Sequence, residues 1–311
     1  MKIILSYASN YKKEVFNILN KLKFNDTIGV ISPAGCEKNN SIDYNLNQLK
    51  KLGFKIKEGK HLRKINNYFA GTDKERASDF MNMFKDPEVA AIMCYRGGYG
   101  SIRMMPYVNW DVIKNNPKIF CGFSDITLLL NYINKVSNIP TFHTPMVNSN
   151  LQDFVTQNFF LNLLTKKYSS INLKNFKNIK TFNSKNITGK ICGGNLSMIC
   201  SALGTPYDID TNNKILLLED INEPAYKIDR MLTQLLMSKK LDKCCGFILG
   251  HFTPYDINTL NLIKNILLPL NKPIILGFPS GHAYPNVSLP LGSNILIDFS
   301  QNIISIEPIF K

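Results

Sequence analysis

The stretch Lys118-Ile-Phe-Cys-Gly-Phe-Ser-Asp-Ile-Thr-Leu-Leu-Leu130 decides the fold, because it passes from a strand to a helix through a tight turn. The apolar run from Ile119 to Cys121 is typical of a buried strand, and apolar residues recur on one helical face over residues 125–136. Ser124 lies on the turn between them, so its Oγ would be lifted off the backbone at the positive end of the helix. The pattern predicts a nucleophile elbow.

The same turn allows a second interpretation. It lacks the full G-x-S-x-G motif, because Ile126 follows Asp125. Ser124 or Asp125 would then do no more than cap the helix by accepting a hydrogen bond from an early backbone N–H. In the catalytic interpretation, the N–H of Asp125 points to the place where an oxyanion would form.

Strands and helices alternate along the first half of the chain. The patterns predict strands over 27–32, 54–57, 90–95, 119–121 and 139–142, and helices over 42–52, 72–84 and 125–136. Alternation of this kind means a parallel sheet with helices on both faces. We therefore predict a Rossmann-like N-terminal α/β domain over residues 26–150 that carries the nucleophile. Residues 1–25 form an N-terminal extension without an assigned role.

The second half of the chain is expected to form a separate domain. Strands are predicted over 187–192, 214–220, 246–250 and 274–277, helices over 196–203 and 226–237, and a terminal hairpin over 294–306. These elements predict a mixed α/β, β-rich C-terminal domain over residues 189–311. The Asn- and Lys-rich residues 151–188 are expected to form a linker region, a helix followed by a connecting segment.

Composition bounds the class of protein. The 311 residues, 44% of them hydrophobic, suffice for a core and fit two domains better than one. The charge of +14 is spread along the chain without a dense basic block, which favours an anionic ligand over a nucleic-acid partner. Seven cysteines without a C-x-x-C pair indicate a reducing compartment. With no apparent signal peptide or membrane span, we expect a soluble cytoplasmic protein.

Among the four histidines, His282 is the best candidate for a general base. It closely follows a strand and lies between Gly281 and Ala283, so little bulk shields it, and the free imidazole titrates near neutrality. An ordinary surface histidine is the alternative. His143 and His251 are expected to be structural, and a fourth histidine, at position 61, to lie on the surface.

Glu219 and Asp220 end an apolar strand, where a carboxylate can orient a histidine through its second ring nitrogen. Alternatively, Glu219 pairs with Arg230 or caps the next helix. The turn Arg96-Gly-Gly-Tyr-Gly100 exposes backbone N–H groups that could cradle a phosphate or supply a second oxyanion donor. It is not G-x-G-x-x-G, which weakens a dinucleotide interpretation. No metal-binding motif is present, so we predict neither a metal nor a cofactor.

Nine short motifs, in order from about residue 26 to the C-terminus, make the chain resemble the LD-carboxypeptidase family of serine peptidases. They are Gly29-Val-Ile-Ser-Pro-Ala-Gly35, Tyr68-Phe-Ala-Gly-Thr72, Arg96-Gly-Gly-Tyr-Gly100, Gly122-Phe-Ser-Asp125, Gly193-Gly-Asn-Leu-Ser-Met198, Leu218-Glu-Asp-Ile-Asn-Glu223, Ile228-Asp-Arg-Met-Leu232, Gly281-His282 and Leu289-Pro-Leu-Gly292. Each motif is modest alone, and together they are specific.

The resemblance implies a role for each matched residue. Ser124 falls on the family's nucleophile, Glu219 on its triad glutamate and His282 on its base. The oxyanion donors fall on the backbone N–H groups of Asp125 and of the glycine turn, at Gly98. Because the serine comes from the first domain and the other two residues from the second, the active site is expected between the domains.

The resemblance also implies a reaction. The substrate would be a murein tetrapeptide or muropeptide, cut between diaminopimelate and its terminal D-Ala in peptidoglycan recycling. Arg96 and Arg230 are candidates for binding the terminal carboxylate, and Asn195 for hydrogen bonding to the peptide. The family suggests a homodimer. Two alternatives remain: a same-family hydrolase of microcin-like aminoacyl-nucleotides, and a non-catalytic nucleotide-binding protein that uses the glycine turn.

Overall fold

The computed structural model describes residues 19–166, 170–253 and 256–311. Most of the expected N-terminal extension, residues 1–18, therefore lies outside the described residues. Of its remainder, Leu19 forms a bridge with Phe310, and the N–H of Leu22 donates to the carbonyl oxygen of Leu164 at 2.8 Å. Both leucines are buried. The described end of this segment thus packs against the body of the protein.

The first sheet has six strands in the order β12-β5-β4-β3-β1-β2, and the first half of the chain supplies five of them. Five strands are mutually parallel, and β12 joins antiparallel to β5. The strands are β1 (Thr27–Ile31), β2 (Lys55–Glu58), β3 (Val89–Cys94), β4 (Ile119–Gly122), β5 (Thr141–His143) and β12 (Leu289–Leu291). The predicted parallel sheet is confirmed, but β12 comes from the far end of the chain and could not be foreseen from local patterns.

Helices cover this sheet in the alternating pattern that the sequence predicts. They are α1 (Ile42–Lys51), α2 (Asp73–Lys85), α3 (Ser101–Met104), α4 (Trp110–Asn115) and α5 (Thr127–Ser137), with single 3-10 turns at Met105–Tyr107 and Ser124–Ile126. Helix α2 begins with a capping box: the Thr72 hydroxyl accepts from the N–H of Glu75, whose carboxylate accepts in return from the Thr72 N–H.

The second sheet has eight strands in the order β6-β14-β13-β8-β9-β10-β11-β7. Its centre, β8 to β11, is parallel, and the strands at both sides are antiparallel. The strands are β6 (Ser170–Asn172), β7 (Lys180–Phe182), β8 (Ile187–Asn195), β9 (Lys214–Ile221), β10 (Gly246–Thr253), β11 (Ile274–Leu276), β13 (Asn294–Asp298) and β14 (Ile303–Ile306). The mixed, β-rich domain and its terminal hairpin are as predicted.

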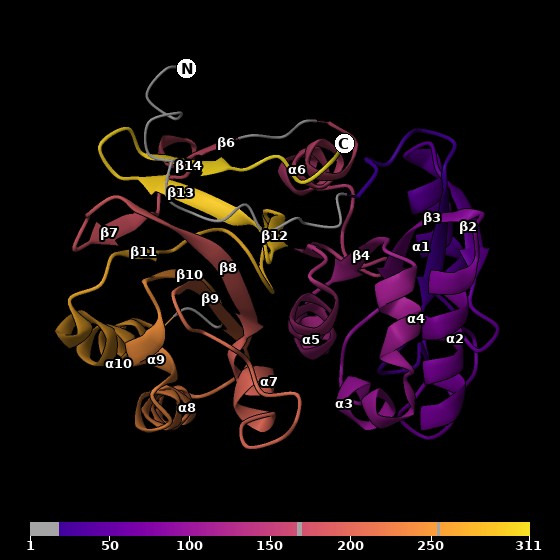
Figure 1. The fold of residues 1–311 in the computed structure, drawn as a ribbon, viewed down its shortest axis with the longest axis horizontal. Coiled ribbons are helices and arrows are strands. Elements are labelled where there is room, and N and C mark those ends of the chain that lie inside the picture. Colours follow the sequence, from indigo (N-terminus) through magenta and orange to yellow (C-terminus); the bar gives the residue numbers. More distant parts are fainter. Residues whose placement is uncertain (1–18, 167–169, 254–255) are drawn as a thin grey trace.

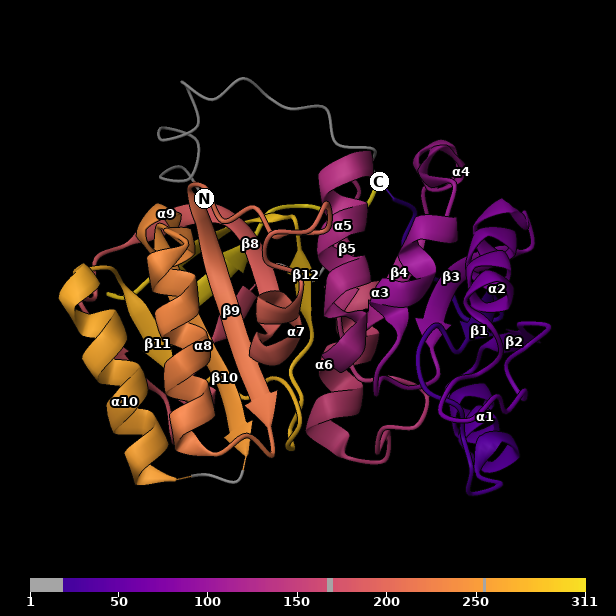
Figure 2. The same cartoon turned by 90° about the horizontal axis from the view of Figure 1, so that it is seen from below.

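The remaining helices pack mostly around the second sheet (Figure 2). They are α6 (Phe154–Thr165), α7 (Leu196–Ser201), α8 (Ala225–Met237), α9 (Lys240–Lys243) and α10 (Ile257–Leu267), with 3-10 turns at Leu173–Asn175 and Leu268–Leu270. Residues 151–188, expected as a linker, hold α6 and also supply β6 and β7, the two edge strands of this sheet. Edge strands of three residues carry too little periodicity to be recognised in sequence.

Helix α5 lies between the two sheets in both views (Figures 1 and 2). One hydrophobic core runs through this region, since it joins Leu129 of α5 and Phe142 of β5 to Ile191, Ile215 and Ile248 of the second sheet. A second core lies under α7, α8 and α10. Among the described residues, no helix is both long and apolar enough to cross a bilayer.

Candidate active site

Ser124 occupies the turn between β4 and α5, as the elbow interpretation requires. Its φ of +63° lies in the left-handed region, which a residue with a side chain occupies only at an energetic cost. Nine of the other ten described non-glycine residues with positive φ are asparagines, which tolerate this conformation. A strained serine at the start of a helix is the geometry of a nucleophile elbow, and simple capping would not require it.

The glycine turn after β3 lies directly against Ser124. A Cβ placed on Gly97 would come within 2.9 Å of the serine Cβ and 3.4 Å of the Asp125 nitrogen, so only glycine allows this approach. Gly98, the next residue, is exposed with a φ of +110°. The loop after β1 supports the turn, because the N–H of Gly35 donates to the carbonyl oxygen of Gly97 at 3.2 Å.

The second sheet and the loop after β11 bring a glutamate and a histidine to the same place. His282 Nε2 lies 3.0 Å from Ser124 Oγ, although the two residues are 158 positions apart. His282 Nδ1 lies 2.6 Å from Oε2 of Glu219, the sixth residue of β9. The histidine side chain is 13% exposed and the glutamate fully buried. Ser124, His282 and Glu219 therefore form one continuous hydrogen-bonded series.

Two glycines make room for the buried carboxylate of Glu219. A Cβ on Gly281 would lie 2.5 Å from Glu219 Oε2, and one on Gly250 would lie 3.1 Å from the glutamate Cβ. Phe123 covers the imidazole of His282 from the first domain, with ring centroids 4.7 Å apart. The carboxylate thus has the imidazole as its hydrogen-bond partner and little access to water, the environment that favours an imidazolium beside it.

This arrangement suits acyl transfer. A hydroxyl that is hydrogen-bonded to an imidazole can lose its proton as it attacks a carbonyl, and a carboxylate on the other ring nitrogen fixes the tautomer. Comparison with known proteins agrees with this chemistry. The family model described as LD-carboxypeptidase N-terminal domain matches residues 28–144, and the corresponding C-terminal domain model matches residues 188–297.

A protein named probable murein peptide carboxypeptidase from Bacillus subtilis is 33% identical, over 97% of this chain and 96% of its own length. The chain belongs to the LD-carboxypeptidase family. The microcin C7 self-immunity protein MccF of Escherichia coli is 29% identical over 92% of this chain and 94% of its own length. The crystal structure of muramoyltetrapeptide carboxypeptidase from Oxalobacter formigenes matches with a TM-score of 0.82 at 27% identity, over 92% of this chain and all of that one.

Membership of the LD-carboxypeptidase family confirms the resemblance drawn from the sequence, the fold class and the prediction of an enzyme. Relatives named as murein peptide and murein tetrapeptide carboxypeptidases support a general carboxypeptidase function. The MccF likeness extends the family beyond murein peptides. The alternative pairing of Glu219 with Arg230 is wrong, since the glutamate contacts His282.

The three predicted substrate-binding residues of this LD-carboxypeptidase differ in their exposure and in the hydrogen bonds that their side chains make within the protein. Arg96 is half-buried beside the glycine turn, with Nη1 donating to the carbonyl oxygen of Cys36 at 3.0 Å. Arg230 is exposed on α8. Asn195 is buried: its Nδ2 donates to Asp220 Oδ1 at 3.0 Å, and its Oδ1 accepts from the Met198 N–H as the cap of α7. Its amide is thus engaged within the protein.

The other histidines have structural surroundings. His143 is fully buried with Nδ1 3.3 Å from Ser280 Oγ, and burial lowers its pKa to about 4. The imidazole Nε2 of His251 lies 3.0 Å from the carbonyl oxygen of Pro285, and the backbone N–H of His251 donates to the carbonyl oxygen of Ser280 at 2.9 Å. Both ends of the loop that carries His282 are thereby held, a role that no local pattern indicated.

One expectation about the histidines is wrong. His61 does not lie free on the surface: its side chain is 16% exposed, and Nδ1 lies 2.9 Å from Asp79 Oδ1. Asp79 also accepts the His61 backbone N–H at 2.7 Å, so the carboxylate fixes the residue from two sides. Asp79 belongs to α2, 18 positions along the chain from His61, so local sequence patterns did not predict this contact.

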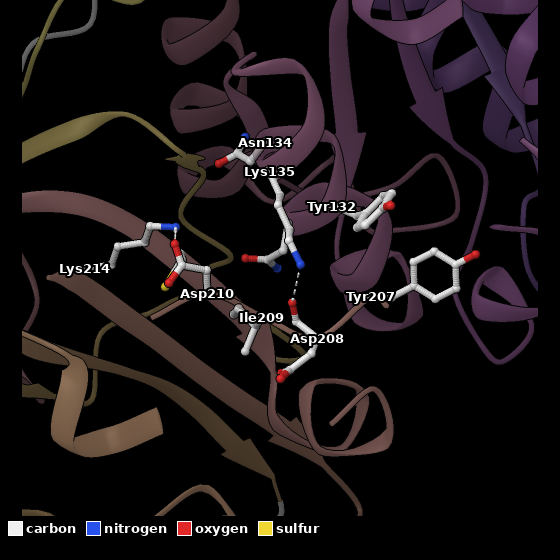
Figure 3. A pocket seen from close by; sticks show the side chains of 10 residues that line it. Tyr132, Asn134, Lys135, Tyr207, Asp208, Ile209, Asp210 and Lys214 are labelled. Atoms are coloured by element: carbon white, nitrogen blue, oxygen red, sulfur yellow. Dashed lines mark hydrogen bonds and ion pairs between the residues drawn. The ribbon is translucent and has the colours of Figure 1, made fainter. Parts of the chain in front are cut away.

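A pocket away from the triad is shown in Figure 3. It lies between α5 and residues 207–214, with Tyr132, Lys135, Tyr207 and Asp208 among its lining, and includes no member of the triad. Within the described residues, no group of three or more His, Cys, Asp or Glu side chains is arranged to hold a metal ion.

Proposed function

We propose that this protein is a serine LD-carboxypeptidase that hydrolyses the bond between diaminopimelate and the terminal D-Ala of murein tetrapeptides. The observation that carries the proposal is the hydrogen-bonded series of Ser124, His282 and Glu219, with distances of 3.0 and 2.6 Å, in a member of this family. The relatives named as murein peptide carboxypeptidases support the choice of substrate.

In the first half of the reaction, Ser124 Oγ attacks the carbonyl carbon of the scissile bond. His282 Nε2 takes the hydroxyl proton and then gives it to the leaving amine of D-Ala as the C–N bond breaks. Glu219 accepts from Nδ1 and stabilises the imidazolium that forms between these two steps. The product left on the enzyme is an ester between Ser124 and the shortened peptide.

The backbone N–H groups of Asp125 and Gly98 hold the oxyanion, and the loss of one such donor typically lowers the rate by about 10²–10³-fold. The half-buried guanidinium of Arg96, beside Gly98, is the cation best placed for the terminal carboxylate. Arg230 is the second candidate. Water, deprotonated by His282, then attacks the ester and releases the tripeptide product.

Mass spectrometry of muropeptides before and after incubation tests the reaction and its specificity together. We expect loss of one alanine from tetrapeptides, with pentapeptides unchanged. Ser124→Ala should abolish D-Ala release. Near wild-type release by that variant would refute the serine mechanism, and loss of any other fragment would refute the assigned bond.

The relationship to MccF supports a second candidate, the hydrolysis of microcin-like aminoacyl-nucleotides by the same residues. The stretch Glu219-Asp-Ile-Asn-Glu223 resembles the murein branch of the family more than the microcin branch. Parallel assays with a murein tetrapeptide and an aminoacyl sulfamoyl adenosine decide between the two candidates, because the preferred substrate has the higher kcat/KM. Binding of a nucleotide without labelling by a serine-directed fluorophosphonate would instead indicate a non-catalytic protein.

The family likeness also supports a homodimer, which sedimentation of the purified protein would test by its mass. A cytoplasmic location is supported by the cysteines, since all seven are free and six are buried. Fractionation of cells that express the tagged full chain would test it. Recovery in a periplasmic or membrane fraction would contradict this assignment.

A further inference from the structure

The nucleophile lies on one domain and its two partners lie on the other. Contacts between the domains must therefore set the distance from Ser124 to His282. Ser124 opens the segment that leads into α5, whereas Glu219 belongs to β9 of the second sheet and His282 to a loop beyond it. We propose that Thr127 and Asn131 of α5 form an interdomain latch that positions Ser124 against His282 and Glu219. The inference rests on the proposed function, because it concerns the same triad.

Thr127 makes the first contact of the latch. It is fully buried one turn after Ser124, and its Oγ1 accepts the backbone N–H of Asn195 at 3.0 Å. Asn195 ends β8 and is the register partner of Glu219 on β9. A single hydrogen bond thus joins the helix of the nucleophile to the strand position beside the glutamate.

Asn131 makes the second contact, one helical turn further along the same face. Its Oδ1 accepts the N–H of Gly193 at 2.9 Å, and its Nδ2 donates to the carbonyl oxygen of Gly193 at 2.8 Å. Nδ2 also donates to the carbonyl oxygen of Thr127 at 2.7 Å, which ties the two latch residues together. The side chain therefore pairs with the β8 backbone much as a neighbouring strand would.

The two glycines of β8 are shaped for this contact. Gly194 has a φ of +130°, and a Cβ there would lie 2.6 Å from Thr127 Oγ1. Gly193 has a φ of +111°, and a Cβ there would overlap the backbone of Leu217 on β9. The backbone at Gly193 and Gly194 therefore packs directly against α5 and β9. A side chain at either position would clash with these neighbours, which explains why both residues are glycines.

These contacts close a ring. From Ser124 the path runs through one helical turn to Thr127, across to Asn195, along the strand pair to Glu219, on to His282 and back to Ser124 Oγ. Every link is a hydrogen bond or a short stretch of regular structure. Loss of the Thr127 link opens the ring at the domain boundary while Glu219 and His282 stay together.

The packing of neighbouring side chains supports a fixed contact at this boundary. Tyr132 of α5 packs edge-on against Tyr207 of the second half, with ring centroids 5.0 Å apart. Lys135 Nζ reaches the carbonyl oxygens of Pro206 and Asp208 at 3.4 Å each, beside the pocket of Figure 3. The face of α5 that carries Asn131 and Lys135 thus meets the second half of the chain over two helical turns.

The test uses Thr127→Val, which keeps the shape of the side chain and removes the acceptor. The readout is the second-order rate of labelling by a fluorophosphonate, which reports the nucleophile without needing the substrate. We expect a fall of about 10–100-fold, the effect of a shift of up to 1 Å in a reacting group. Thr127→Ser keeps the hydroxyl and should restore most of the rate.

The matched control is Thr141→Val. Thr141 is also fully buried, and its Oγ1 donates to the carbonyl oxygen of Leu130 in α5 at 3.0 Å, but this contact joins β5 to α5 within the first domain. Its labelling rate should stay within about 3-fold of wild type, even if its stability falls as much as that of the Thr127 variant. An equal loss in both variants would overturn the inference.

Proton NMR separates positioning from general disruption. The Nδ1 proton of His282, held against Glu219 at 2.6 Å, should give a far-downfield signal. That signal should survive in Thr127→Val, because both groups lie on the second domain. Its loss, or labelling at the wild-type rate, would refute the latch.

If Thr127→Val does not fold, Asn131→Asp provides the second variant. It keeps the acceptor for the Gly193 N–H but places a carboxylate oxygen against two carbonyl groups. It should slow labelling in the same range, and a wild-type rate in a folded Asn131→Asp protein would overturn the proposal. Wild-type protein that is not labelled at all would refute the proposed serine mechanism itself, a result distinct from failure of the latch.

Discussion

The backbone strain at Ser124 predicts that its replacement by glycine gives a more stable protein than its replacement by alanine. The serine has a φ of +63°, which costs a residue with a Cβ about 1–2 kcal/mol and costs glycine nothing. Glycine loses more conformational entropy on folding, about 0.5–1 kcal/mol relative to alanine. Both variants lose the hydroxyl and its hydrogen bond to His282, so that contribution cancels in the comparison.

The difference leaves Ser124→Gly more stable than Ser124→Ala by about 0.5–1 kcal/mol. Equilibrium unfolding in urea at 25 °C measures it directly, with both variants inactive in D-Ala release. Ser78, in the interior of α2, provides the control position with ordinary helical geometry. There, the alanine variant should be the more stable by about 1 kcal/mol.

The predicted order is therefore opposite at the two positions. If Ser124→Gly is equal to or less stable than Ser124→Ala, the serine is not held in a strained conformation. The structural argument for a nucleophile elbow would then fail, although the triad distances would remain. An unchanged slope of free energy against urea concentration in both variants would show that the variants differ in stability and not in the compactness of the denatured state.

Three further outcomes follow from the site. Glu219→Gln should lower kcat by about 10²–10⁴-fold with a smaller change in KM, because an amide cannot stabilise the imidazolium of His282; steady-state D-Ala release measures this, and a loss below 10-fold would contradict it. Gly281→Ala should reduce both activity and stability, since its Cβ would lie 2.5 Å from the Glu219 carboxylate, whereas Gly204→Ala shares a positive φ, has open space around the Cβ and should keep full activity. His143 is neutral when folded, because burial lowers its pKa from 6.5 to about 4; the unfolded chain therefore binds one more proton between these values, and stability is lost as the pH falls from 6.5 to 4, by about 3 kcal/mol in total. In urea unfolding at several pH values, His143→Asn should lack that part of the acid dependence, and an unchanged dependence would show that the histidine is not responsible.

Much of the fold was predictable because its parts are local. The period of apolar residues in α5 and the uninterrupted apolar runs of β3 and β9 report how each segment is buried. The turn at Ser124, the cap at Thr72 and the glycine turn at 96–100 have chemistry that can be read from a few neighbouring residues. The order of the family motifs extended this local evidence to the three residues that we propose as the triad.

The tertiary structure decided which of the open interpretations holds. Whether Glu219 met Arg230 or His282 depended on a contact across 63 positions, and whether Asn195 was free depended on Asp220 in the next strand. Likewise, no local sequence pattern predicted that β12 pairs with β5 in the first sheet.

The sequence by itself determined most of the secondary structure and the family, and it indicated the residues that we propose for the reaction. Only the tertiary structure decided how Ser124 meets its partners, through the contact of α5 with β8 that Thr127 and Asn131 make. The physical reason is range: side-chain periodicity reflects burial within one element, whereas a distance of 3.0 Å between Ser124 and His282 is set by the packing of two domains. The role of Thr127 and Asn131 cannot be predicted from sequence, because their hydrogen-bond partners on the β8 backbone come from a distant part of the chain.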